Sequence, residues 1–243
     1  MNSELYTAAS GLINEQRRLD MISNNLANMS TSGFRAQRLF STVYSGLGRD
    51  APSSVRAANA GVAVAGAYDV PGPGPVRSTG RDLDVALEDG SFLTVQTAGG
   101  RRYARAGNLT VSASGALTDT AGRGLLDPRG KPISGLSPDT SIASDGRVLS
   151  NGSEVARLAV VRDPGGVLIR EGDGLLAAGG REGELEAIAQ PRLRPGWLEG
   201  SSTDPLIELV QLIEAQRSFE SNQRLISLTM NEVNRRAIND LAG

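Results

Sequence analysis

The chain of 243 residues contains no cysteine and no histidine. Zinc sites built from these residues, thiol nucleophiles, Ser-His-Asp triads and imidazole general bases are therefore all excluded. The lack of cysteine does not fix the compartment, although it suits a protein that passes through oxidising surroundings and must not cross-link. Lys131 is the only lysine, so nearly all of the 25 basic residues are arginines, interleaved with 27 acidic ones. This mixture is typical of a solvated surface.

Aromatic residues are also scarce, at 4% of the chain, and apolar residues reach only 39%. With 30 glycines and 11 prolines, the middle of the chain is expected to form turns and short strands rather than a thick core. A net charge of −2 gives no bulk field that would favour nucleic acid. The N-terminus lacks the basic and apolar regions of a secretory signal, and "AANAGVAVAGAY" is too short and polar to span a bilayer. Composition alone thus predicts a soluble cytoplasmic protein without membrane insertion.

The N-terminal segment carries apolar residues with the a/d spacing of a coiled coil. They are Leu5, Leu12, Leu19, Ile22 and Leu26. This spacing predicts a long helix from about residue 3 to residue 29. A polar Ser-Thr-Ser-Gly stretch follows, in which Gly33 can take the left-handed conformation that ends helices.

A second long helix is predicted at the other end of the chain. Asp204 fits an N-cap and Pro205 a first helical residue. Apolar residues then recur at three- and four-residue spacing, at Leu209, Leu212, Phe219, Ile226, Met230 and Val233. Gln216 and Gln223 interrupt this stripe, which would cost stability but fix register. We expect the two apolar seams to pair with each other or with neighbouring copies, as an assembly interface.

The middle of the chain has a different texture. Short apolar runs between residues 78 and 198 alternate with Gly, Asp, Asn and Pro, which predicts short antiparallel strands. Asn151-Gly152 between two such runs predicts a hairpin. The expected fold is α+β: long N- and C-terminal helices form a coiled-coil-like domain, and a central all-β domain of short antiparallel strands lies between them. The expected parts are an N-terminal helix and elbow (1–45), an extended connector (46–77), the β-domain (78–200) and a C-terminal helix (201–243).

The densest group of acidic residues is a candidate for chemistry. It comprises Asp82, Asp84, Glu88 and Asp89. It fails as an EF-hand loop, because Ala86 and Leu87 stand where a ligand and a glycine are required. A paired-carboxylate hydrolase site stays open as an alternative, although acids beside a turn are far more often solvated.

Three stretches closely resemble the bacterial flagellar rod and hook proteins. They are "LYTAASGL", "QRRLDMISNNLANMSTSGFRAQR" and "ELVQLIEAQRSFESNQRLI". The residues that match the specific family motif are Asn24, Asn25, Leu26, Ala27, Asn28, Thr31, Gly33 and Phe34. The middle segment "RDLDVALEDGSFLTVQTAGGRRYARAGNLTV" is similar to the β-domain of the longer members, except that "DGSFL" replaces the usual Gly-x-Gly-Phe-Phe run.

The resemblance implies a structural, non-enzymatic subunit with no catalytic residue, cofactor or metal ion. It is nearest to the proximal-rod proteins of the family and next to the distal-rod proteins. Such a subunit assembles helically, with copies of itself and with other rod subunits, into a hollow shaft that transmits torque from motor to hook. The resemblance further implies recognition by the flagellar type III export apparatus, export without a cleaved signal, and a location in the rod crossing the periplasm. This replaces the cytoplasmic expectation.

Under this interpretation the asparagine-rich motif ends the N-terminal helix and turns the chain outward, with asparagine side chains satisfying freed backbone groups. Two alternatives of other classes remain. One is a periplasmic carbohydrate-active enzyme that uses the acids from Asp82 to Asp89, and the other is a soluble binding module whose terminal helices only dimerise a β-domain. An enzyme would bury its apolar seams within one molecule, whereas a shaft subunit would bury them between molecules.

Overall fold

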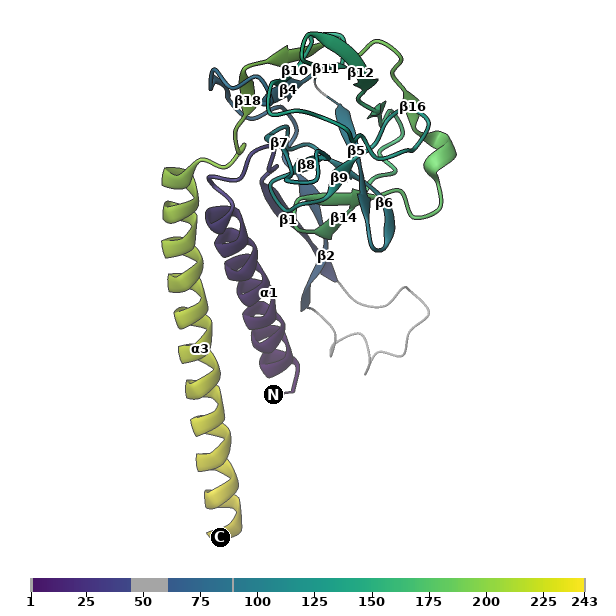
Figure 1. Cartoon of the computed structure of the whole chain (residues 1–243). Helices are drawn as coiled ribbons and strands as arrows, with labels where there is room; N and C mark the ends of the chain where they lie inside the picture. Colours follow the sequence, from purple (N-terminus) through teal and green to yellow (C-terminus); the bar gives the residue numbers. More distant parts are fainter. Residues whose placement is uncertain (1, 45–60, 89, 243) are drawn as a thin grey trace. The chain divides into compact units, whose positions relative to one another are not determined.

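The computed structural model describes residues 2–44, 61–88 and 90–242 (Figure 1). The chain forms two compact units, and both are discontinuous in sequence. Unit 1 comprises Met1–Asn28, Ala36–Val70 and Thr203–Gly243, and unit 2 comprises Met29–Arg35 and Pro71–Ser202. The chain therefore leaves unit 1 twice and returns to it twice.

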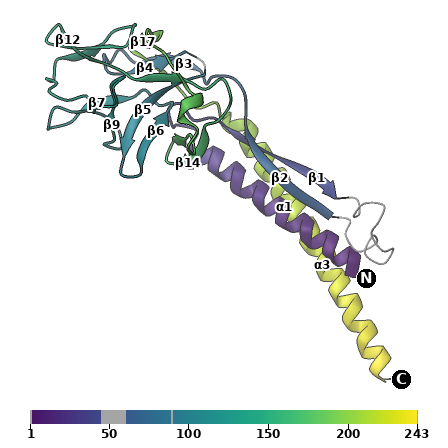
Figure 2. The same ribbon diagram turned by 90° about the vertical axis from the view of Figure 1, so that its right-hand side faces the viewer.

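Within the described residues, unit 1 contains two helices and a two-stranded sheet. They are α1 (Asn2–Ala27), α3 (Pro205–Ala242), β1 (Gln37–Tyr44) and β2 (Gly61–Asp69). The strands pair antiparallel, with a bulge between Phe40 and Ser41. Helix α1 packs against both α3 and β2, as Figures 1 and 2 show.

The two helices of unit 1 run antiparallel. Asn25 near the end of α1 lies opposite Glu208 near the start of α3, with 3.4 Å between amide nitrogen and carboxylate. About two turns before Asn25 on α1, Arg18 Nη2 is 4.0 Å from Glu214 Oε2. Helix α3 is longer than α1, and Figures 1 and 2 show that it continues past the N-terminal end of α1.

The start of α3 confirms its prediction from the sequence. The carboxylate of Asp204 accepts hydrogen bonds from the backbone N–H groups of Leu206 (2.9 Å) and Ile207 (3.3 Å). This is the geometry of an N-cap, which satisfies N–H groups that have no partner inside the helix. Pro205 follows as the first helical residue, where its missing N–H costs nothing.

The prediction that long terminal helices form a coiled-coil-like domain is wrong, although the chain is α+β overall. Helix α1 has only 26 residues, and the two-stranded sheet β1-β2 packs beside it. On α3, Leu209 and Met230 of the predicted seam are 45% and 44% exposed, whereas Glu208 and Ala215 are fully buried. A polar and a small residue thus hold the most buried positions of α3, with Leu212, Phe219 and Ile226 only half-buried. Glu208 and Ala215 permit hydrogen bonding across the pair instead of the interlocking of apolar side chains that a coiled coil requires.

The predicted connector, 46–77, is only partly within the described residues. Residues 46–60 lie outside them, and the rest of this range is largely strand rather than connector. Residues 61–69 form β2, which pairs with β1 on both sides of the bulge. Strand β3 begins at Val76.

Unit 2 is built of short strands joined by tight turns. The strands are β3 (Val76–Ser78), β4 (Val85–Leu87), β5 (Ser91–Thr97), β6 (Gly100–Ala104), β7 (Leu109–Val111), β8 (Leu117–Asp119), β9 (Gly124–Leu125), β10 (Thr140–Ile142), β11 (Arg147–Ser150), β12 (Ser153–Arg157), β13 (Val160–Arg162), β14 (Ile169–Gly172), β15 (Leu175–Ala177), β16 (Glu186–Ala187), β17 (Leu193–Pro195) and β18 (Trp197–Glu199), with one 3₁₀ turn, η1 (Glu182–Glu184). All pairs between these strands are antiparallel. The central region is therefore mostly β, as expected.

The strands of unit 2 form several sheets around one core. The largest has nine strands and runs β14-β15-β6-β5-β9-β8-β7, with β13 and β16 joined beside β5. A second sheet contains β10-β11-β12, and two ribbons pair β17 with β4 and β18 with β3. Asn151 and Gly152 both have positive φ (49° and 76°) in the β11–β12 turn, which confirms the predicted hairpin. Leu93, Leu117 and Val148, all fully buried, lie in the shared core.

Candidate functional site

The family motif is divided between the two units, because the chain crosses from unit 1 to unit 2 after Asn28. In unit 1, the amide of the fully buried Asn25 pairs with the backbone of Gln37. Its Nδ2 donates to the Gln37 carbonyl and its Oδ1 accepts from the Gln37 N–H, both at 2.9 Å. The side-chain amide thus pairs with the backbone of Gln37 as a neighbouring strand would. These bonds fix the position of the first residue of β1 at the end of α1.

A buried charge pair lies beside Asn25. Glu208 of α3 is fully buried, and its Oε1 is 2.7 Å from Nη2 of Arg38 on β1. Since removal of Arg38 would leave the buried Glu208 carboxylate without a counter-charge, the burial of Glu208 depends on Arg38. Asn25, Arg38 and Glu208 therefore tie α1, β1 and α3 together inside unit 1. Neither Arg38 nor Glu208 stood out in the sequence, because their positions follow from pairing over more than 160 residues.

The neighbouring motif residues close the end of α1. Asn28 donates from its backbone N–H (3.1 Å) and from Nδ2 (2.9 Å) to the carbonyl of Asn24. The Asn24 carbonyl thus accepts both the usual helical bond and a second one from the Asn28 side chain, which fixes that side chain at the end of α1. Leu26 is half-buried, whereas the side chains of Asn24 and Ala27 are exposed.

The second half of the motif belongs to unit 2. Gly33 is buried with φ +68°, and its N–H donates to the Glu199 carbonyl at 2.9 Å. A Cβ there would lie 2.8 Å from the carbonyl carbon of Arg105, so the position requires glycine for space as well as for φ. Phe34 follows and is buried, with the Arg170 guanidinium 5.0 Å from its ring centroid. Thr31 has an exposed side chain, and its carbonyl accepts from the Phe34 N–H.

A buried ion pair organises this part of unit 2. Arg105 and Glu199 are 5% and 3% exposed, and Arg105 Nε donates to Glu199 Oε2 at 2.7 Å. The other Arg105 nitrogens donate to the carbonyls of Leu87, Glu88 and Ser91 at 2.6 to 3.1 Å. Full use of these donors is what makes a buried guanidinium tolerable. The only sequence hint was its place in the "YARAGN" segment of the family resemblance.

Glu199 also contacts segments of the chain that lie next to the crossings between the two units. Glu199 Oε1 accepts from the Gly74 N–H at 3.1 Å and lies 3.6 Å from Arg35 Nη2. Arg35 also donates to the Gly72 carbonyl. The Ser202 N–H donates to the Phe34 carbonyl at 2.9 Å. The motif therefore anchors the crossing segments at one place within unit 2, which is more than the simple elbow expected.

The predicted interface residues differ widely in burial. Ile22 is buried, and a group of five is half-buried: Leu12, Leu19, Leu212, Phe219 and Ile226. Leu209 and Met230 are exposed. The side chains of Leu5 and Val233 lie outside the described part of the chain. The interrupting Gln216 and Gln223 are both exposed.

Sequence reasoning missed a broader apolar surface on α3. Its first two turns and its later part carry large side chains that are 44% to 72% exposed: Leu206, Ile207, Leu209, Val210, Ile213, Leu225, Leu228 and Met230. The exposed apolar side chains from Leu206 to Ile213 lie within about two turns of the helix. Groups of exposed apolar side chains mark interaction sites in soluble proteins. The signal was present as the run "PLIELVQLI", which is apolar on more than one face of a helix.

The acidic residues singled out for catalysis do not gather into a site. Asp82 and Glu88 are exposed, Asp84 is buried beside Arg81 (3.5 Å), and Asp89 lies outside the described residues. The burial of Asp84 contradicts the expectation that these acids are solvated. Among the described residues, no three acidic side chains converge as metal ligands would.

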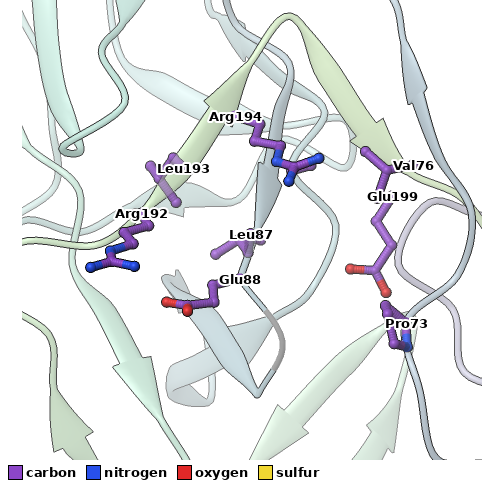
Figure 3. Close-up of a pocket in the computed structure, with 9 residues that line it drawn as sticks. Pro73, Val76, Leu87, Glu88, Arg192, Leu193, Arg194 and Glu199 are labelled. Carbon is purple, nitrogen blue, oxygen red and sulfur yellow. The ribbon is translucent and has the colours of Figure 1, made fainter.

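The cavity of interest in unit 2 has a volume of about 490 Å³ and is lined by strands β3, β4, β17 and β18 (Figure 3). Of the described members of the acidic group only Glu88 lines it, and Glu88 is 3.6 Å from Arg162. The other lining carboxylate, Glu199, is held by Arg105. Among the described residues, no free pair of carboxylates faces this cavity, so they do not offer the arrangement that glycoside hydrolysis requires.

Models of known protein families match both ends of the chain. The model of the family described as "Flagella basal body rod protein" matches residues 5–35, and that of "Flagellar basal body rod FlgEFG protein C-terminal" matches residues 194–240. Flagellar basal-body rod protein FlgF of Caulobacter vibrioides is 32% identical over 99% of this chain and 98% of its own. The chain belongs to the flagellar basal-body rod protein family.

Other relatives of this family are also matched over nearly their whole length. FlgG of Bacillus subtilis is 30% identical, with 98% of this chain and 99% of the relative covered. FlgF of Salmonella typhimurium is 32% identical, with 93% and 94% covered. The chain is accordingly a structural rod protein of the flagellar basal body and not an enzyme. Within the described residues, no helix has a stretch long and apolar enough to cross a membrane.

Proposed function

We propose that this chain is a proximal-rod subunit, which assembles helically with copies of itself and with other rod subunits into a hollow shaft that transmits torque. FlgF relatives from several bacteria support the proximal position, and the nearly equal similarity of an FlgG makes a distal-rod subunit the second candidate. We further propose export by the flagellar type III apparatus without a cleaved signal, and a location in the rod that crosses the periplasm.

The observation that carries this proposal is the exposed apolar surface of α3. Leu206, Leu209 and Ile213 follow one another at helical spacing and are 72%, 45% and 51% exposed. Burying such side chains against a neighbour stabilises an assembly by roughly 1.5–3 kcal/mol for each one fully covered. We therefore propose that Leu209 and Met230 face other subunits directly. The half-buried residues of the predicted interface, such as Leu19 and Ile226, support the helix pair that presents this surface.

Leu209→Glu tests the proposal because it changes this surface without touching the buried contacts of unit 1. A carboxylate in a covered interface costs several kcal/mol, and every subunit of a helical assembly repeats that cost. We expect the variant to be exported and soluble but absent from isolated basal bodies, and the cells to be non-motile on soft agar.

Gln216→Glu is the matched control, since it places the same residue on an exposed position of the same helix. It should leave motility close to normal. Normal motility of the Leu209→Glu strain, with the variant present in its basal bodies, would contradict assembly through α3.

A further inference from the structure

Two arginines line the cavity of unit 2 at strand β17: Arg192 directly precedes the strand and Arg194 lies within it. Arg192 and Arg194 flank the buried Leu193, so the alternation of a strand sends both side chains to the same face. Both line the cavity shown in Figure 3, together with apolar groups that include Val76 and Leu87. We call this the arginine cavity.

The charges around the arginine cavity do not cancel. Neither Arg192 nor Arg194 forms an ion pair with a carboxylate of the described residues. Glu199 is engaged by Arg105 and by the Gly74 N–H. Glu88 is shared with Arg162. Two guanidinium groups therefore face a partly enclosed space with no carboxylate of their own, which is an arrangement that attracts carboxylates.

The same unit carries a complementary segment. Glu182, Glu184 and Glu186 lie within five residues of η1 and β16, which we call the acidic segment. All three side chains are exposed, and none is in an ion pair with the described residues. Leu185 between them is half-buried, so the segment offers carboxylates around one apolar side chain. The arginine cavity offers the reverse, guanidinium groups around apolar walls.

These two features lie on different sides of unit 2. Figure 1 shows β16 on one side of the β-unit and β18, which borders the arginine cavity, on the other. One copy therefore cannot satisfy its own cavity with its own acidic segment. Copies that follow one another in the same orientation can do so, since such head-to-tail contacts join two different patches and repeat without closing.

We propose that the acidic segment of one copy docks in the arginine cavity of the next, which makes a second copy of this chain the partner of this surface. The inference rests on the proposed function only in requiring that copies assemble. It adds a contact between the unit 2 of one copy and the unit 2 of the next, besides the contact proposed for the exposed apolar surface of α3. Because its charges are close to solvent, the contact should weaken as salt rises.

Charge reversal on the purified full chain tests the proposal. Arg192→Glu/Arg194→Glu makes the cavity acidic beside an unchanged acidic segment. Glu182→Arg/Glu184→Arg/Glu186→Arg makes both surfaces basic. Neither reversal removes an ion pair within the described molecule, so the thermal unfolding temperature should stay near that of the unmodified chain, and this measurement shows whether each variant folds.

Sedimentation velocity at low salt should show self-association of the unmodified chain and about tenfold weaker association of each variant alone. An equimolar mixture of the two variants should recover the association, because each cavity then meets a segment of opposite charge. A mixture no better than its components, or an unmodified chain that stays monomeric at millimolar concentration, would overturn the proposal.

A disulfide test reports the contact directly, since the chain has no cysteine of its own. Arg194→Cys/Glu184→Cys should oxidise to a ladder of covalent multimers, whereas each single variant can give only dimers. The control pair Ser153→Cys/Glu184→Cys uses an exposed position on β12 and should give no ladder. Absence of a ladder from the first pair, or equal ladders from both, would overturn the contact. These measurements do not depend on motility, so the proposal for α3 and this one can fail separately.

Discussion

Gly33 lies where a side chain has no room and where the backbone is left-handed. Any Cβ at this position would overlap the backbone of Arg105 and Ala106 at 2.8 and 2.9 Å. Backbone atoms held by strands on both sides cannot move aside cheaply. The sequence alone indicated only that Gly33 could end a helix, whereas its close contact with Arg105 depends on the packing of unit 2.

Gly33→Ala should destabilise unit 2 by about 2–4 kcal/mol, from the left-handed φ and the overlap together. Gly122→Ala is the control, because Gly122 has a similar φ (+80°) but open space around it. It should cost about 1 kcal/mol. Denaturant unfolding of the two variants measures the difference, and equal losses would show that the contact with Arg105 does not restrict this position.

At the scale of elements, the side-chain amide of Asn25 holds the start of β1 against the end of α1. Asn25→Asp keeps the shape of the side chain but removes the N–H that donates to Gln37, and it adds a negative charge beside Glu208. We expect a loss of about 3 kcal/mol in the stability of unit 1. Hydrogen exchange of the Gln37 N–H should accelerate accordingly.

Asn24→Asp provides the comparison for this element. It makes the same chemical change one residue earlier on an exposed side chain, and should shift stability by no more than about 0.5 kcal/mol. If Asn25→Asp were equally mild, the pairing with Gln37 would not be what positions β1.

Local signals in the sequence located several elements and turns correctly. Asp204 and Pro205 marked the start of α3, and Asn151-Gly152 marked a hairpin, because caps and two-residue turns are decided by neighbouring residues. The heptad leucines indicated an apolar stripe but not what covers it. Leu209 is exposed and Glu208 buried because the inner face of α3 is set by hydrogen bonds to α1 and β1, which no periodicity reports.

Long-range pairing was the other part that the sequence did not reveal. Strand β3 pairs with β18 and β4 with β17, over more than 100 residues in each case. Asp84, expected to be solvated, is buried where its backbone bridges Asn108 and its carbonyl accepts from the Gly196 N–H. The arginine cavity and the Arg105–Glu199 pair arise from the same pairings, so neither could be assembled from local patterns.

For the whole molecule, the Arg105–Glu199 pair holds together the parts of unit 2 that are most distant in sequence. Glu199→Gln should destabilise unit 2 by about 3–5 kcal/mol, because it leaves a buried guanidinium without its counter-charge. Amide exchange should rise at Gly33, Gly74 and Ser202 together, since all three bond to this region.

Glu154→Gln is the control for that measurement. Glu154 also pairs with an arginine, Arg157 at 2.9 Å, but the pair is largely exposed and its loss should change stability little. Similar losses of stability in the two variants would mean that the buried Arg105–Glu199 pair contributes no more to stability than an exposed pair does. A rise in exchange at only one of the three amides would mean that the crossing segments are held independently.

The contacts of Glu199 with Arg35, Gly74 and Arg105, which we call the clamp, also affect how the sequence of such a protein can change during evolution. Arg35 and Gly74, on two of the segments by which the chain enters unit 2, contact the Glu199 side chain, and Ser202 on the segment that leaves binds the carbonyl of Phe34, next to Arg35. Hairpins remote from the clamp, such as β11–β12, can therefore lengthen, shorten or be exchanged as a cassette while the crossing points stay fixed. A gene with this architecture can vary the size of its β-unit without redesigning the helices that flank it.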